Sequence, residues 1–280
     1  MKFSGTIMRK HKRSMVIRMK MTLYKHEMKM NRKSLMIWAL CVGFICFGCI
    51  LLYTSLEDSI QDISASFSNL GMMSAALGMD KMSLGTLQGY YATEIAMMHG
   101  LGGAMFAAML GIDMISKEKS GHTTEFLNVL PIERGSVLFS KYLALFSNIV
   151  LFNLICIALY FLGFVMMGEK IDGKEFVLYH SASALMQLEV GTVCFFLSAV
   201  VKKAAAGIGI GITVLLFAAD MMCRVVPAIE NLKYITPFYY ANAADIFTDG
   251  KWNSIMIITG AGVILAAYTA AWYRYGKKDL

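Results

Sequence analysis

The chain has 280 residues, of which 57% are hydrophobic and 16% are charged, whereas about 25% of residues are charged in a typical soluble domain. This composition excludes an ordinary soluble fold, and the low content of Pro (3 residues) and Gly (24 residues) excludes a disordered or collagen-like chain. The net charge of +7 would suggest nucleic-acid binding unless the placement of the charge has another cause.

The first 34 residues form a basic segment with one apolar stripe. Ile17, Met21, Tyr24 and Met28 recur at steps of three or four residues, which predicts an amphipathic helix. Lys and Arg occupy much of its remaining surface. We therefore expect residues 1–34 to form a basic cytoplasmic segment whose helix lies in the membrane interface, bound through the stripe and anionic lipid. A solvated basic tail is the alternative.

Six apolar runs are each long enough to cross a bilayer, which takes roughly 20 residues of helix. Because backbone groups in hydrocarbon must bond to one another, such runs predict helices. The sequence thus predicts an all-α integral membrane protein, with a six-helix transmembrane domain at 35–273 and a cytoplasmic tail at 274–280. The predicted spans are residues 35–53, 92–115, 143–167, 177–201, 204–223 and 255–273.

The Lys and Arg residues outside the spans indicate the orientation. With the N-terminus inside, the inner segments hold 20 of these residues and the outer segments hold 6. The positive-inside rule then predicts a multi-pass protein with both termini in the cytoplasm. The charge of +7 follows from this topology, so nucleic acid is not expected as a partner. In the outer loop 54–91, apolar residues at steps of three or four predict a short helix on the outer surface.

The loop 116–134, between the second and third spans, is the most informative segment outside the membrane. Thr123 can cap a short helix with an apolar side at Phe126 and Leu127, and Pro131 ends that helix. A helix this short cannot form a core of its own and is suited to dock into a groove of a soluble partner. The alternative is a helix that only covers the end of the bundle.

The same loop carries a longer pattern: Glu118-x-x-x-His122-Thr123-x-Glu125-Phe126-Leu127-x-x-x-Pro131-x-x-Arg134, with Lys141 seven residues further on. It resembles the first cytoplasmic loop of type-2 ABC transporter permeases. The segments 21–38, 234–240 and 276–280 also resemble parts of these permeases, so the similarity extends over about residues 21–280.

The resemblance implies the permease subunit of a bacterial ATP-driven exporter, located in the bacterial plasma membrane. The loop would hold a short cytoplasmic coupling helix that contacts a separate ATP-binding subunit. Other implied partners are a second permease copy or a paralogue, together with membrane lipid. The residues implied at or beside the ATPase contact are Thr123, Glu125, Phe126, Leu127 and Pro131, with Arg134 positioning the turn.

No G-x-x-x-x-G-K-[ST] phosphate loop occurs in the sequence, so we expect a transport subunit without an ATPase site of its own. The resemblance implies that ATP and Mg are bound by the partner subunit. No cofactor and no metal site are expected in this chain. Peptides, drugs, lipids and ions are all compatible with it as cargo.

Polar groups inside the spans are candidates for the translocation path, because a charge at the bilayer centre costs roughly 2.5–3.5 kcal/mol. Glu189 lies midway along the fourth span with Gln187 nearby, and His99 lies in the second span. Glu189 would contact cargo or change its pairing during transport, or it would form only an interhelical hydrogen bond. Asp220 has Arg224 four residues on, which predicts a local ion pair.

Two other functions are alternatives to the exporter. A cation-coupled secondary transporter would use Glu189, but the spans hold few ionisable groups for ion coupling. An intramembrane enzyme is less favoured, because the sequence contains neither H-E-x-x-H nor G-x-S-x-G. Small residues repeat at four-residue steps in three of the spans, which predicts close helix contacts within the chain or with another subunit. These stripes are Gly103, Ala107 and Gly111; Gly207 and Gly211; and Gly262, Ala266 and Ala270.

Overall fold

Helices dominate the computed structural model, which describes residues 2–68, 71–120, 133–171, 173–201 and 206–277 and has no strand within these ranges. Six helices are long and apolar enough to cross a membrane, which confirms the all-α, six-span prediction. The long helices are α1 (Lys2–Ser68), α4 (Ala96–Ser120), α6 (Arg134–Met167), α7 (Gly173–Val200), α8 (Ala206–Val225) and α10 (Ser254–Gly276).

Shorter helices connect the long ones. The π-helix η1 joins α3 to α4, so that Leu87–Glu118 forms one span. The other connecting helices lie between α1 and α3 and between α8 and α10. They are α2 (Met72–Leu77), α3 (Leu87–Tyr90), η1 (Tyr91–Ile95), the 3-10 helix η2 (Pro227–Tyr234) and α9 (Ala243–Asp249).

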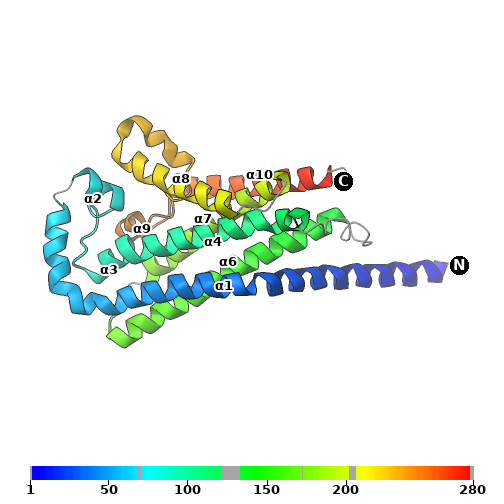
Figure 1. Cartoon of the computed structure of the whole chain (residues 1–280), viewed down its shortest axis with the longest axis horizontal. Helices are drawn as coiled ribbons and strands as arrows, with labels where there is room; N and C mark the ends of the chain where they lie inside the picture. The colour runs from blue at the N-terminus through cyan, green and yellow to red at the C-terminus, as the bar shows by residue number, and fades with distance from the viewer. Residues whose placement is uncertain (1, 69–70, 121–132, 172, 202–205, 278–280) are drawn as a thin grey trace.

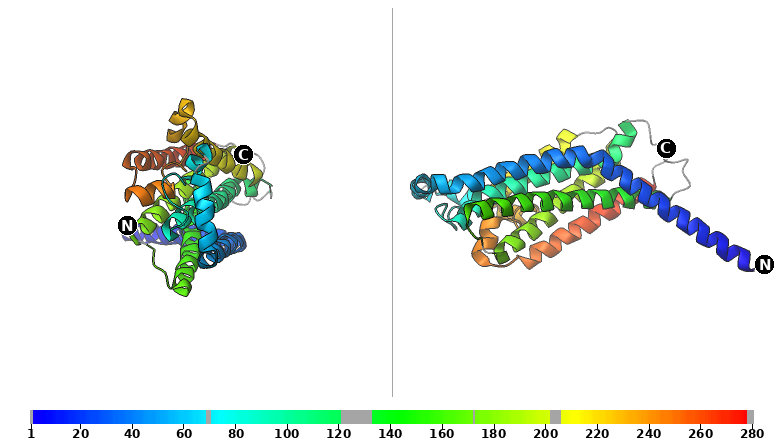
Figure 2. Two further views of the ribbon diagram at one scale, coloured as in Figure 1. Left: turned by 90° about the vertical axis from the view of Figure 1, so that its left-hand side faces the viewer. Right: turned by 90° about the horizontal axis from the view of Figure 1, so that it is seen from below.

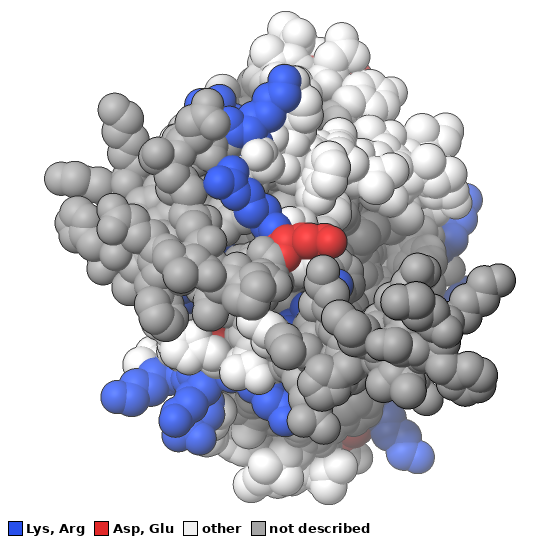
Figure 3. Space-filling view, turned by 90° about the vertical axis from the view of Figure 1, so that its right-hand side faces the viewer, with Lys and Arg blue, Asp and Glu red and all other residues white. Residues whose placement is uncertain are grey.

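The start of α1 and the end of α10 lie on the same side of the bundle (Figure 1), as an even number of crossings requires. We call this side the terminal end; α4 also ends there at Ser120 and α6 begins there at Arg134. The opposite end carries α2, α3 and α9 (Figure 1). Figure 3, seen toward the terminal end, shows Lys and Arg at several places on the described surface and few Asp and Glu.

Residues 19–34 do not form a separate helix, because they continue without a break into the first span as part of α1. No Gly or Pro lies between residues 17 and 42, so nothing in the sequence ends the helix there. The N-terminal part of α1 extends beyond the bundle (Figure 2). The expected apolar stripe is partly covered by protein: Tyr24 donates to Ser147 of α6 at 3.0 Å, and Met28 also packs against the core.

Helices α4 and α7 pack closely through small residues. A Cβ at Gly103 would lie 2.3 Å from Gln187 Nε2, and one at Gly111 would lie 2.3 Å from the carbonyl oxygen of Gly191. The predicted stripe on α4 is therefore used inside the chain. By contrast, a Cβ at Gly207, Gly211 or Gly262 would meet no described heavy atom within 4 Å.

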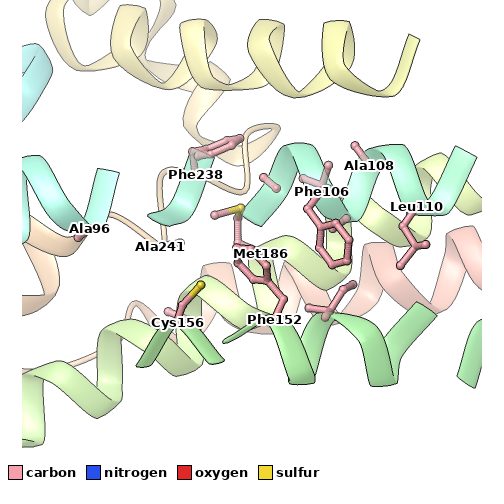
Figure 4. Close-up of a cluster of buried hydrophobic side chains, with 14 of the residues drawn as sticks. Ala96, Phe106, Ala108, Leu110, Phe152, Cys156, Met186, Phe238 and Ala241 are labelled. Atoms are coloured by element: carbon pink, nitrogen blue, oxygen red, sulfur yellow. The ribbon is translucent and has the colours of Figure 1, made fainter. Parts of the chain in front are cut away.

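The segment between η2 and α9 reaches into the bundle. Figure 4 shows Phe238 and Ala241 of this segment near the core side chain Met186, and both belong to the buried core. Tyr240, between them, is also buried. Residues far from any predicted span thus contribute to the interior.

Candidate functional site

Four charged side chains meet inside the bundle near the terminal end; we call Glu27, Lys117, Glu118 and Lys141 the four-charge cluster. Lys141 Nζ lies 2.6 Å from Glu27 and 2.5 Å from Glu118, and Lys117 Nζ lies 2.5 Å from Glu27. Lys141 also donates to the carbonyl oxygen of Met114 at 2.9 Å. The three donors of the Lys141 ammonium therefore each have an acceptor.

The four-charge cluster joins three helices. Glu27 comes from α1, Lys117 and Glu118 from α4, and Lys141 from α6. The side chain of Lys141 is 0% exposed and that of Glu27 is 2% exposed. Such burial is tolerable because two cations face two anions at hydrogen-bonding distance. Helices α4 and α6 flank residues 121–132, so the cluster links the two helices from which the 116–134 loop extends.

Arg134 lies at the first turn of α6, on the other side of the same loop. Its guanidinium donates to the carbonyl oxygen of Gly276 at 3.3 Å. A Cβ at Gly135 would lie 2.9 Å from Trp272 Nε1, so the start of α6 lies directly against the end of α10. Arg134 thus connects the C-terminal helix to the base of the loop.

A second group of polar side chains is buried between α4, α6 and α7. His99 Nε2 lies 3.1 Å from Asn153 Oδ1, and Asn153 Nδ2 donates to Gln187 Oε1 at 2.7 Å. His99 Nδ1 lies 3.0 Å from the Tyr160 hydroxyl. Because the Asn153 amide nitrogen donates to Gln187, its Oδ1 accepts, which assigns the proton of neutral His99 to Nε2. The path candidates His99 and Gln187 therefore belong to one network.

His180 extends this network toward the opposite end. Its ring centroid lies 4.8 Å from that of His99, and its Nε2 lies 2.8 Å from the Tyr91 hydroxyl. Its Nδ1 is buried and has no hydrogen-bond partner among the described residues. The sequence shows both histidines, but their proximity depends on the packing of α4 against α7.

Glu189, the third path candidate, lies apart from the other two. Its Oε2 accepts a hydrogen bond from the Tyr240 hydroxyl at 2.8 Å, and it faces Gly260 of α10. Glu189 and Gln187 are two residues apart on α7, which separates their directions by about 200° on a helix of 3.6 residues per turn. Glu189 thus lies on another face of α7 from Gln187, outside the network that His99 and Gln187 share.

The sequence model described as "ABC-2 family transporter protein" matches residues 21–280. The chain belongs to the ABC-2 transporter family. No curated protein matches it. The matched range equals the range over which the sequence resembles type-2 ABC permeases, and the match confirms that resemblance.

Membership in the ABC-2 family makes this chain a membrane permease of an ABC transporter, a transport subunit that associates with an ABC ATPase subunit. Most residues expected at the ATPase contact lie outside the described residues: Thr123, Glu125, Phe126, Leu127 and Pro131. Arg134 is described and lies at the base of their loop. In the part of this ABC-2 permease that the structure describes, no group of three or more His, Cys, Asp or Glu side chains could hold a metal ion.

Several residues of these sites were not predicted from the sequence, among them Glu27, Asn153 and Tyr240. Glu27 lies in a basic segment and is the sole acidic residue among residues 1–34. This isolation could have indicated that Glu27 pairs with a Lys or Arg of the chain. Asn153 and Tyr240 gave no signal, because single polar residues in apolar surroundings are common. Their roles depend on contacts between segments far apart in the sequence.

A chain of charges joins the segments at the opposite end of the permease. Arg224 bonds Asp220 at 3.2 Å, which confirms the predicted local pair, and it also bonds Asp245 of α9 at 3.0 Å. The same guanidinium lies 4.4 Å above the ring of Tyr239. Lys81 completes the chain, 2.5 Å from Asp245. These contacts hold α9 and the segment before it against α8.

Replacing Lys81 by Met is expected to lower the free energy of unfolding by less than about 1 kcal/mol at pH 8, because its side chain is 44% exposed. Burial lowers the pKa of Lys81, but its hydrogen bond and attraction to Asp245 outweigh burial and raise the pKa above the ordinary value. The stabilisation is therefore full below the unfolded-state pKa of about 10.4 and is lost as pH rises through the folded-state pKa.

The free energies of unfolding of Lys81→Met and of the wild type, measured in detergent at pH 8 and at pH 11, test this dependence. The difference between the two proteins should shrink at pH 11. Lys251→Met is the control, since Lys251 is exposed and forms no ion pair among the described residues. A difference that is equal at both pH values would contradict the role of the Lys81 ammonium.

Proposed function

We propose that this permease is the membrane subunit of a bacterial ATP-driven exporter. A separate ATP-binding subunit docks on the 116–134 loop and binds ATP and Mg. Thr123, Glu125, Phe126, Leu127 and Pro131 form or border the contact, and Arg134 positions the turn. A second permease copy or a paralogue pairs with this chain to enclose the translocation path, for which Glu189, His99 and Gln187 are candidate residues.

One observation carries the coupling assignment. In the four-charge cluster, Lys141 bonds Glu118 of α4 and Glu27 of α1 while itself belonging to α6. The two helices that flank the loop are therefore linked to each other and to the N-terminal helix. A partner that shifts the loop would therefore move all three helices together. If ATP binding changes how the partner contacts the loop, this linkage lets the nucleotide favour one of two conformations of the bundle.

Charge placement supports the orientation. The segments assigned to the inner side carry 20 Lys and Arg against 6 on the outer side, which supports a cytoplasmic location for both termini and the 116–134 loop in a plasma-membrane protein. Anionic lipid is the partner of the exposed basic residues in the N-terminal part of α1.

Reversing the charge of Glu125 (Glu125→Lys), or inserting Gly-Gly after Leu127, is expected to reduce co-purification of the ATPase by at least tenfold, because both changes disrupt the short helix proposed to dock on it. The ATPase is the one that co-purifies with the wild-type chain. Glu169→Lys is the matched control, since Glu169 is an exposed carboxylate after the end of α6 on the opposite side.

Intact assembly and unchanged nucleotide-dependent transport in the loop variants would overturn the coupling assignment. Transport that continues without any ATPase would instead favour a secondary transporter. Neither result depends on the interior network, the buried polar group of His99, Asn153, Tyr160, His180 and Gln187.

A further inference from the structure

Glu189 lines a small pocket at the surface of the bundle. The pocket lies between α7, α10 and the segment that follows η2, and other residues of its wall are Thr236, Pro237, Tyr240, Thr259 and Gly260. Its volume of about 10 Å³ is close to the space that one water-sized group needs. A group as small as an ammonium fits such a pocket.

One oxygen of the Glu189 carboxylate is hydrogen-bonded to the protein, and the other is available to a ligand. Its Oε2 accepts from the Tyr240 hydroxyl at 2.8 Å. Its other oxygen has no hydrogen bond among the described residues, although the residue is only 6% exposed. Gly260 creates the space, because a Cβ there would lie 2.6 Å from Glu189 Oε2 and 3.1 Å from the Tyr240 hydroxyl.

The surface around the pocket is apolar. Ile235, which is part of the wall, is 68% exposed, and Ile255 and Ile258, the neighbours of the wall residues Met256 and Thr259, are 72% and 71% exposed. Ile255 and Ile258 belong to the last span, so side chains with this exposure face hydrocarbon. A ligand therefore enters from the bilayer and carries an apolar chain.

The polar groups of the wall select a protonated amine. Thr236 and Thr259 donate their hydroxyl protons to backbone carbonyls, at 2.8 Å and 2.9 Å, so the oxygens of these two wall residues can act only as acceptors toward a ligand. One carboxylate with hydroxyl acceptors and a tyrosine ring suits an ammonium group. Ca²⁺ takes six to eight oxygens, and an anion would be repelled by Glu189. Lys233, also in the wall, is paired with Glu230.

We propose that this Glu189 pocket binds the primary ammonium group of an amphiphile whose chain lies in the bilayer. The amine belongs either to a lipid headgroup or to an amphiphilic cargo. The pocket itself does not depend on the proposed exporter function, whereas its use for cargo rests on that function.

Binding of tritiated dodecylamine to the permease in phosphatidylcholine nanodiscs tests the pocket, with empty nanodiscs as the background. Glu189→Gln is expected to weaken binding at least tenfold, because it removes the anion while leaving an oxygen for the Tyr240 hydrogen bond. Glu94→Gln, which removes a carboxylate of the second span outside the pocket wall, should bind like wild type. Dodecanol and dodecyltrimethylammonium should not compete.

A matched pair of glycine variants on α10 covers the case in which Glu189→Gln fails to fold. Gly260→Ala fills the pocket and should also weaken binding at least tenfold, whereas Gly262→Ala adds a methyl group where no described atom lies within 4 Å and should not. Equal affinity in wild type, Glu189→Gln and Gly260→Ala would overturn the proposal, as would equal weakening by Gly260→Ala and Gly262→Ala.

Two further arms distinguish the sources of the amine. If the ligand is a lipid, phosphatidylethanolamine in the nanodisc will displace dodecylamine from the wild type and phosphatidylcholine will not. If it is cargo, vesicles that contain the permease with its ATPase will move dodecylamine when ATP is added, and the Glu189→Gln variant will not. Loss of ATPase co-purification in the loop variants involves none of these residues, so the two proposals fail independently.

Discussion

Replacing Lys141 by Met is expected to lower the free energy of unfolding by about 3–5 kcal/mol, which is the usual effect of removing one partner from a buried ion pair. The side chain of Lys141 is 0% exposed and its ammonium contacts both Glu27 and Glu118. Without it, Glu27 and Glu118 each lose a buried cation at hydrogen-bonding distance, and the carbonyl oxygen of Met114 loses its donor. Chemical unfolding of the purified permease in nanodiscs measures the difference.

The control for Lys141→Met removes the anions as well. In the triple variant Glu27→Gln, Glu118→Gln and Lys141→Met, no uncompensated carboxylate is left, so much of the lost stability should return. A triple variant as unstable as the sum of its single changes would show that the four charges act independently. Lys141→Met with wild-type stability would show that the ion contacts contribute nothing.

Local sequence signals predicted six spans, and the helices of the structure extend beyond these predicted ranges at one or both ends. The last span, expected at 255–273, is observed at Ser254–Gly276. The third span, expected from residue 143, belongs to a helix that begins at Arg134. The polar residues Ser136, Ser140 and Lys141 made this first part look like a loop, yet all three are buried. Lys141 can be buried because its partners come from other helices, which no window of local hydrophobicity detects.

The same distinction separates the site residues that could be predicted from those that could not. Asp220 and Arg224 are four residues apart, so helix geometry alone predicts their pair. Glu27 and Lys141 are separated by 114 residues, and Glu189 and Tyr240 by 51. Periodicity fixes the face on which such a residue lies but not the register between helices. The sequence therefore identified Glu189 as a candidate, and only the packing of α7, α10 and the segment 235–242 supplies its partner.

Adding a methyl group at Gly111 is expected to destabilise the permease, whereas the same change at Gly211 is expected to be neutral or stabilising. A Cβ at Gly111 would lie 2.3 Å from the carbonyl oxygen of Gly191 and 3.1 Å from the Phe195 nitrogen. These are backbone atoms, so relief requires moving α4 away from α7. Overpacking of this kind typically costs about 1–3 kcal/mol and occasionally more.

Gly211→Ala is the matched control, because a Cβ there would meet no described heavy atom within 4 Å. Alanine is favoured over glycine inside a helix by about 0.5–1 kcal/mol, so this variant should unfold at the same or a slightly higher denaturant concentration. Equal destabilisation by the two variants would mean that helix propensity or lipid contact, and not the α4–α7 packing, decides the result.

The two glycine variants also separate two uses of small-residue stripes that look alike in sequence. Each of the two glycines is the last member of its stripe. Of the two, only Gly111 approaches another part of the described backbone. Close approach of α4 and α7 brings His99 within reach of His180 and places Gln187 beside Gly103. Gly111→Ala should therefore disturb the interior network as well as stability. Gly211→Ala should leave that network intact, since α8 contributes no residue to it.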